Sequence, residues 1–440
     1  MFDQSRRRRV FNRFKRLASP SIALAIVTSI AFFVYSIAST FDGSFTYFHR
    51  LVLQEQLIDN STLYSYLWAF GAFLSFLAGG VIVNFAHKPN HRTPKHFPLE
   101  DSAFRTIFNG FLFTFITAFA WIGVAIIQFG GISSLANLAA ADNIAARDVI
   151  LTASFPGGRL ISSGFIGIAV LSATLLGMGL WKSNTRKRFT IFLVLFVSLA
   201  YLGIAPILVS GRINFFVAVI GAFIGSSFAA GRVIGARYIP IGVLLLVGAW
   251  TAKQYFSLGH MAEDISVFDQ SVEGFFFYLY NDALNLLNTI GQLDNNKTLG
   301  WYSLRFIFFF TFTQNKLLDF IADARIQIGN YVTAGEVPFL AAPIVDFGLW
   351  GVLILVLFGF CAQYVYLKAP LNLLYSTIYG MILACLILSP HASFITSQEV
   401  IYSILLVSFL ARRMRYYQMP MQSKTSEIIL PQQFYHPYRR

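Results

Sequence analysis

The chain has 440 residues, of which 56% are hydrophobic, 17% aromatic and only 12% charged. This composition excludes an ordinary soluble protein, because too few polar side chains are present to cover so much apolar surface. The formal net charge of +13 would suit a nucleic-acid partner. However, the basic residues cluster at the ends of apolar runs, so they indicate membrane topology and no nucleic-acid partner.

Ten apolar runs follow one another along the chain, and a helix needs roughly 20 apolar residues to cross a bilayer. The first run comes after a basic segment that starts at Arg6, and its length favours a retained signal anchor over a cleaved signal peptide. The seventh and tenth runs are short or interrupted. The sequence therefore predicts an all-α fold, a polytopic transmembrane bundle of about ten spans. The runs are residues 21–38, 63–85, 107–127, 160–181, 189–209, 213–229, 239–250, 339–366, 371–388 and 400–411.

The charges between the runs predict how the chain is oriented. If successive runs alternate from a cytoplasmic amino terminus, 24 of the 33 Lys and Arg residues fall on one side, and the other side holds nine basic and 16 acidic residues. This asymmetry follows the positive-inside rule and predicts that both termini are cytoplasmic. The predicted parts are a basic segment (1–20), spans one to seven (21–255), a large outer loop (256–338), spans eight to ten (339–411) and a cytoplasmic tail (412–440).

The outer loop contains apolar residues at helical spacing with polar residues on the opposite side. Such spacing predicts amphipathic helices that lie along the outer membrane interface. The short apolar run 306–312 is too short to span, so we expect it to dip into the membrane or pack onto the bundle. The two sets of apolar positions are Phe277, Tyr280, Leu284, Leu287 and Ile290, followed by Leu317, Phe320, Ile321, Ala324 and Ile328.

Arginines on the outer side are the candidate substrate-binding residues. The sequence has no phosphate-binding Walker loop, no nucleophile elbow and no outer Asp-x-Asp pair, so neither a metal nor a cofactor is predicted. A guanidinium grips phosphate oxygens in a bidentate way and can stabilise a diphosphate leaving group without a metal. Arg212 stands out because it lies in a turn of a few residues between two spans. The candidates are Arg147, Arg159, Arg212, Arg305 and Arg325.

Four residues of the outer side are candidate general bases: His260, Glu336, Asp346 and His391. A histidine has an ordinary pKa near 6.5, suited to taking a proton from a sugar hydroxyl, and burial raises the pKa of a carboxyl. Asp346 lies within the start of the eighth run, where an unpaired charge is costly. We therefore expect it to have a partner, and an outer arginine is the natural one.

With these features, the chain resembles the Wzy-type O-antigen polymerases, which join oligosaccharide repeat units, and the related O-antigen ligases. The resemblance rests on the number of spans, on the large outer loop late in the chain, and on Ser210, Gly211 and Arg212 at the outer end of a central span. It also rests on residues 338–351 (PFLAAPIVDFGLWG), a Pro-rich entry into a helix.

The resemblance implies a metal-independent glycosyltransferase of the bacterial inner membrane that takes part in O-antigen, capsule or exopolysaccharide synthesis. Its donor and acceptor would be glycans linked to undecaprenyl diphosphate, and its partners would include membrane lipids and other assembly proteins, such as a chain-length regulator. Two alternatives stay open. The ligase differs mainly in its acceptor, and a transporter or flippase of polysaccharide precursors would need polar residues at mid-span and internal symmetry.

Overall fold

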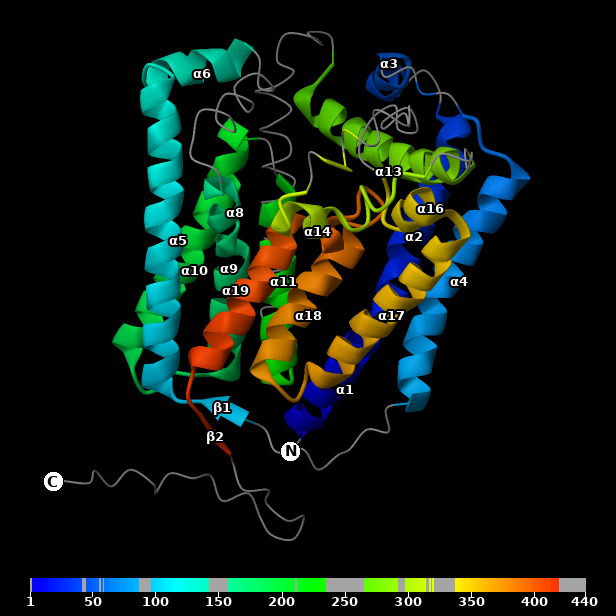
Figure 1. Ribbon diagram of the computed structural model, residues 1–440. Helices are drawn as coiled ribbons and strands as arrows, with labels where there is room; N and C mark the ends of the chain where they lie inside the picture. Colours follow the sequence, from blue (N-terminus) through cyan, green and yellow to red (C-terminus); the bar gives the residue numbers. More distant parts are fainter. Residues whose placement is uncertain are drawn as a thin grey trace, which may run out of the picture.

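The computed structural model describes residues 2–41, 45–54, 57, 59–86, 96–141, 157–209, 212–234, 265–291, 297–313, 316–317, 319 and 337–418. These residues form a helical bundle with one short pair of strands, β1 (His96–Pro98) and β2 (Tyr416–Gln418) (Figure 1). The predicted all-α, polytopic fold is therefore confirmed. Helices are the expected form for these runs, because every backbone N–H and C=O in lipid must find its partner within the segment.

Within the described residues, seven helical segments are long and apolar enough to cross a membrane. Two shorter helices, α18 (Leu373–Ile387) and α19 (Gln398–Arg413), occupy the predicted ninth and tenth runs. The predicted seventh run, 239–250, lies outside the described residues. The seven segments are formed by α2 (Pro20–Ile37), α4 (Leu63–Ala86), α5 (Glu100–Gln128), α8 (Gly158–Ser162) with α9 (Gly164–Met178), α10 (Thr185–Val209), α11 (Arg212–Ala230), and α16 (Ala342–Phe347) with α17 (Gly351–Lys368).

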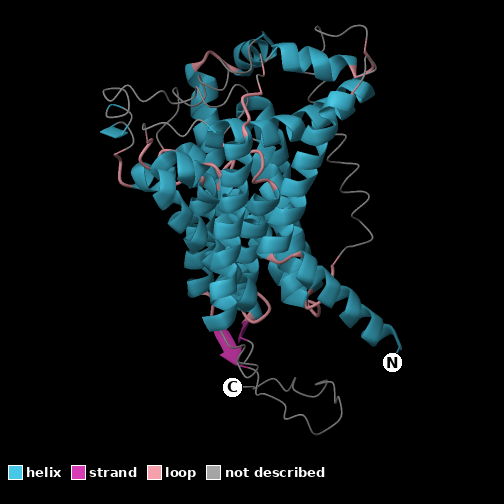
Figure 2. Cartoon of the chain, turned by 90° about the vertical axis from the view of Figure 1, so that its right-hand side faces the viewer, coloured by secondary structure: helices cyan, strands magenta, loops and turns pink. Residues whose placement is uncertain are grey.

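The two ends of the bundle differ in what covers them. We call the end with α1 (Phe2–Leu17), β1 and β2 the basic end, because arginines and lysines of α1, α10 and α19 gather there. At the opposite end, which we call the far end, three helices lie across the bundle (Figure 1): α3 (Thr46–Gln54), α6 (Ile132–Ala141) and α13 (Val267–Gly291). Figure 2 shows the same division from the side. Short helices and turns complete the far end: η1 (Ala38–Thr40), α14 (Arg305–Phe310), η3 (Gly348–Trp350) and η4 (Phe394–Thr396).

Glycines set how closely neighbouring spans approach. A Cβ atom built on Gly79 of α4 would lie 2.0 Å from the carbonyl oxygen of Val356, and one built on Gly359 of α17 would lie 1.9 Å from that of Phe76. Such distances exclude any side chain, so the two backbones touch directly. In a membrane, where lipid is as apolar as leucine, this close contact is a main source of helix association.

The centre of the bundle is α9, which is buried along nearly its whole length and packs against α10, α11, α18 and α19. Its sequence is a mixture of small and apolar residues without a charged side chain. That composition fits a helix surrounded by other helices on every side. The central helix therefore positions the amino end of α19, which belongs to the candidate site.

The outer loop differs in part from its prediction. A helix does form around Phe277 and Ile290, but both of these side chains are buried in the protein, as are Asn281, Asp282 and Asn285 on the polar side. The carboxyl half of α13 is thus covered by protein all round, not exposed to the membrane interface on its apolar side. Helix α14 has six residues and is too short to span, as predicted. Most of the second predicted amphipathic helix (317–328) lies outside the described residues.

Candidate functional site

His391 lies in the far-end loop between α18 and α19. The loop begins with a tight turn, in which the His391 N–H donates to the Leu388 carbonyl oxygen at 3.2 Å. The Ser389 carbonyl then accepts from the Phe339 N–H at 3.1 Å, which ties the loop to the entry of α16. The turn directs the His391 ring toward α13.

The partner of His391 is Asp282 of α13. Its carboxylate oxygen Oδ1 lies 2.9 Å from His391 Nδ1. The Asp282 side chain is only 8% exposed, whereas that of His391 is 29% exposed. Burial raises the pKa of the Asp282 carboxyl, while the hydrogen bond and charge of His391 act in the opposite direction. A buried carboxylate bonded to Nδ1–H fixes the imidazole tautomer whose other nitrogen, Nε2, can accept a proton.

Aromatic rings enclose the imidazole on two sides. The centroid of the His391 ring is 5.6 Å from that of Tyr278 and 6.1 Å from that of Phe394, which is roughly parallel to it. These contacts restrict the orientation of the ring. The histidine is therefore held by a hydrogen bond to a carboxylate and by packing, which is the arrangement a positioned base requires.

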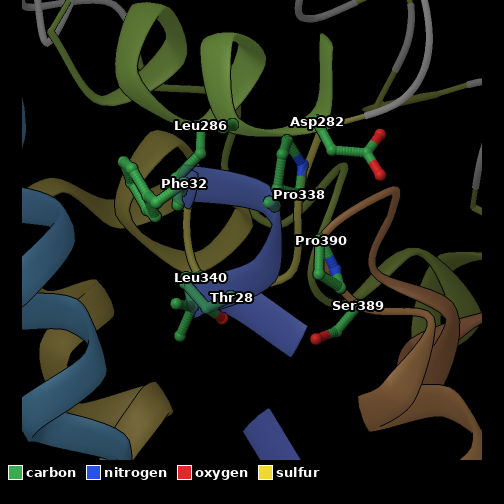
Figure 3. A pocket seen from close by; sticks show the side chains of 10 residues that line it. Thr28, Phe32, Asp282, Leu286, Pro338, Leu340, Ser389 and Pro390 are labelled. Carbon is green, nitrogen blue, oxygen red and sulfur yellow. The ribbon is translucent and has the colours of Figure 1, made fainter. Parts of the chain in front are cut away.

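Two hollows adjoin α13. The one beside Asp282 is a cavity of ≈ 10 Å³ lined by residues that include Phe32, Leu286 and Pro390, with room for about one water molecule. The Asp282 carboxylate points away from its apolar wall (Figure 3). The second hollow is open and much larger, ≈ 440 Å³, and lies where α3 meets the amino end of α13. Its lining residues are Phe45, Thr46, Ile265, Ser266, Asp269, Val272 and Glu273.

Arg159 is paired with an acidic residue that the sequence analysis did not single out. A guanidinium nitrogen of Arg159 lies 3.2 Å from the Glu399 carboxylate, and the two side chains are 38% and 12% exposed. Glu399 is in the first turn of α19, eight residues after His391. The first turn of a helix favours a negative charge, so this position suits a carboxylate or a phosphate.

Arg305 adjoins the same helix from another direction. It begins α14, which packs against α19, and its guanidinium lies over the Trp301 ring at 4.8 Å. A guanidinium stacked on an indole keeps its edge available for hydrogen bonds to an anion. Arg159 and Arg305 are therefore both positioned beside α19 at the far end.

Asp346 has a different environment from the expected one. The predicted arginine partner is wrong: within the described residues its carboxylate accepts from the hydroxyls of Thr298 and Ser303 and from the N–H groups of Tyr302 and Ser303. The side chain is fully buried. Residues 298–303 fold back over the start of α16 and place their hydroxyl and N–H donors against the carboxylate. These donors satisfy the carboxylate, so it has no need of an arginine. Asp346 holds this turn in place and is enclosed by protein donors.

The remaining candidates have fewer structural data. Arg212 is the first residue of α11, at the far end, and its side chain is not among those described. His260, Glu336, Arg147 and Arg325 lie outside the described residues. Among the residues that are described, no group of three or more His, Cys, Asp or Glu side chains is arranged to hold a metal ion.

Sequence reasoning missed Asp282 and Glu399. Asp282 belongs to a polar stripe on α13 with Asn285 and Thr289, spaced like the apolar stripe that predicted the helix. Such a stripe is ordinarily read as the solvated face of an amphipathic helix. The sequence does not show that this polar stripe is buried, so Asp282 was not identified as a candidate.

The fold and the site define a multi-pass helical membrane protein with a histidine–carboxylate pair at one end of the bundle. Comparisons with protein-family models, curated proteins and solved structures find no match to this chain.

Proposed function

We propose that this protein is a metal-independent glycosyltransferase that polymerises oligosaccharide repeat units linked to undecaprenyl diphosphate. The reaction would take place at the far end of the bundle, on the periplasmic face of a bacterial inner membrane. The observation that carries the proposal is the His391–Asp282 pair, a held base at the end of the bundle where a lipid-linked glycan would be presented.

In this proposal, His391 Nε2 takes the proton of an acceptor hydroxyl, and Asp282 stabilises the imidazolium that forms. The acceptor oxygen bonds to the anomeric carbon of the donor as the bond from that carbon to the diphosphate oxygen breaks. The diphosphate leaves with the bonding electrons and is stabilised by arginines. The imidazolium then returns its proton to solvent.

Arg159, Arg305 and Arg212 are the residues proposed to hold the diphosphate. The Arg159 guanidinium is paired with Glu399, and a diphosphate, with its greater charge, would compete with that carboxylate for the arginine. The start of α19 adds N–H groups that favour an anion. The diphosphate would therefore lie close to the bundle, where a lipid-anchored donor places it.

The acceptor glycan is proposed to run along α13. Asp269, which lines the ≈ 440 Å³ hollow, is 13 residues before Asp282, or about 20 Å along a helix. The hollow has the size of an ordinary ligand site, whereas the cavity beside Asp282 is too small for a sugar. Phe45 supplies an aromatic face and Thr46 a hydroxyl, both suited to a sugar ring.

The test is complementation of a deletion strain with His391→Ala, and with His49→Ala as the matched control. His49 is also a far-end histidine, but its ring nitrogen bonds the Phe41 carbonyl at 3.0 Å and not a carboxylate. Surface polysaccharide should be capped with single repeat units in the His391→Ala strain and should be full length in the control. Full-length polymer from His391→Ala contradicts the proposal.

The same strains distinguish the alternatives. Accumulation of unattached polymer in the deletion strain points to a ligase, and loss of outward delivery of the lipid-linked unit points to a flippase. Membrane fractions probed for the protein show whether each variant inserts, so that loss of polymer is not mistaken for loss of protein.

A further inference from the structure

Helix α1 carries a one-sided set of exposed basic side chains at the basic end. The arginine side chains at positions 8, 9, 13 and 16 are all exposed. At 100° per residue they fall within one sector of the helix. No carboxylate of the described residues forms an ion pair with any of these four. The face is strongly positive and has no acidic partner among the described residues.

The opposite face fixes α1 to the bundle. The Phe11 ring packs edge-on against Phe228 at 6.1 Å, and Phe14 packs against Phe223 at 5.8 Å. The Tyr366 hydroxyl donates to the Lys15 carbonyl oxygen at 2.9 Å. Helix α1 is therefore held by side-chain and backbone contacts, and its arginines are presented in a fixed direction.

A third strip of α1 is apolar and exposed. Val10 and Leu17 are seven residues apart on the same side, next to the arginine face, and are 50% and 58% exposed. The chain passes from α1 through Ala18 and Ser19 directly into α2, the first apolar span. Figure 2 shows α1 leaving the end of the bundle obliquely, beyond the flank of the neighbouring helices. Leu17 is the last residue of α1, three residues before the start of α2, and Val10 lies two turns further along α1.

We propose that α1 is a binding site for anionic phospholipids. Its four exposed arginines bind the headgroup phosphates, and Val10 and Leu17 enter the adjacent acyl region. The charge selects an anion, and each arginine near an anionic lipid surface strengthens binding by roughly fivefold. The apolar strip beside the charges selects a lipid over a free phosphate, because a soluble anion gains nothing from it. This site is independent of the transferase activity proposed above.

The experiment measures lipids retained by the purified full-length protein in native mass spectrometry. Detergent solutions contain equal amounts of phosphatidylglycerol and phosphatidylcholine. The wild type should retain phosphatidylglycerol in preference, and the quadruple variant R8Q/R9Q/R13Q/R16Q should lose this preference at least tenfold. V10Q/L17Q, which keeps every charge, should retain less of both lipids than the wild type.

The matched control is R186Q/R188Q/R412Q/R413Q, which removes four exposed positive charges of the same end from α10 and α19. It should keep the preference of the wild type. An equal loss in this control overturns the proposal, because lipid selection would then follow bulk charge. Displacement of phosphatidylglycerol by an equal concentration of inorganic phosphate also overturns it, since that result describes a free-anion site.

A second measurement tests with the wild-type protein alone whether lipid covers α1. Trypsin cleaves after arginine, so wild-type protein in nanodiscs reports whether α1 is covered. Cleavage after Arg9 and Arg13 should be at least tenfold slower in phosphatidylglycerol nanodiscs than in phosphatidylcholine nanodiscs, while cleavage after Arg188 should differ little. Equal cleavage of α1 in the two lipids contradicts the proposal.

Discussion

The carboxylate of Asp282 lies 2.9 Å from His391 Nδ1, although 109 residues separate the two in the chain. One comes from a helix that lies across the far end, and the other from the loop between two membrane helices. The pair therefore joins α13 to the membrane helices at the far end of the bundle, where the proposed chemistry takes place.

Replacing Asp282 by Asn should reduce polymerisation about 100-fold or more, within the range that a positioned acid or base contributes. Asparagine keeps the shape of the side chain but neither stabilises the imidazolium nor enforces the tautomer. The measurement is the rate of chain extension from purified lipid-linked repeat units. Asp101→Asn is the control, because Asp101 is an exposed acid at the basic end, paired with Lys187 and far from the proposed site. Equal rates in the two variants would remove Asp282 from the mechanism.

The same residue makes the stability of the protein depend on pH. Burial raises the pKa of Asp282 in the folded protein, so the folded state holds this proton more tightly than the unfolded chain. The protonated carboxyl therefore contributes to the free energy of unfolding. This contribution is fully present below the pKa of Asp282 in the unfolded chain, near 3.9, and is lost as the pH rises through its pKa in the folded protein. As the pH rises above about 4, the melting temperature of the wild type should therefore fall relative to that of Asp282→Asn. Parallel curves would show that the carboxyl has no shifted pKa.

Asp346→Ala should destabilise the protein by about 2–4 kcal/mol, because it leaves hydroxyl and N–H donors of residues 298–303 buried without their acceptor. Thermal unfolding in detergent measures the loss, and limited proteolysis should show earlier cleavage in this turn. Asp346→Asn retains one acceptor oxygen and should lie between Ala and wild type. An unchanged melting temperature in Asp346→Ala would mean that these hydrogen bonds do not hold the turn.

Gly79→Leu should separate α4 from α17, because a Cβ at this position would lie 2.0 Å from the Val356 carbonyl oxygen. Overpacking of this kind costs about 1–3 kcal/mol or more. Gly71→Leu, also on α4, is the control, since nothing lies within 4 Å of a Cβ built there. The melting temperature should fall for the first variant only. A similar fall in both would indicate a general effect of leucine on α4 and not a close helix contact.

Arg212→Ala should abolish chain extension while the protein still inserts normally. The reason is the loss of a positive charge at the start of α11, where the proposal places the diphosphate. Polysaccharide length and membrane content are measured in the same strain. Arg186→Ala, an exposed arginine of the basic end, should leave chain length unchanged. Full-length glycan from Arg212→Ala would show that Arg212 does not bind the diphosphate.

Much of the fold could be predicted because a membrane helix can be recognised from the composition of its own segment. The runs that became α2, α4, α5 and α10 are apolar over the length of a bilayer, and their backbones have no other way to satisfy hydrogen bonds in lipid. The charges at their ends predicted the separation between a basic end and a far end. His391 and Arg159 were also named as candidates from the sequence, because few ionisable side chains are expected where they lie, and their role in a site stays a prediction.

The sequence alone therefore determined the class of protein, the helical bundle and part of the candidate site. The tertiary structure decided the partners: Asp282 for His391, Glu399 for Arg159, and hydroxyl and amide donors in place of an arginine for Asp346. The physical reason is the difference in sequence distance over which the two kinds of signal act. Hydrophobic periodicity acts over a few turns of one helix, whereas these pairs form between segments whose approach depends on how every intervening helix packs.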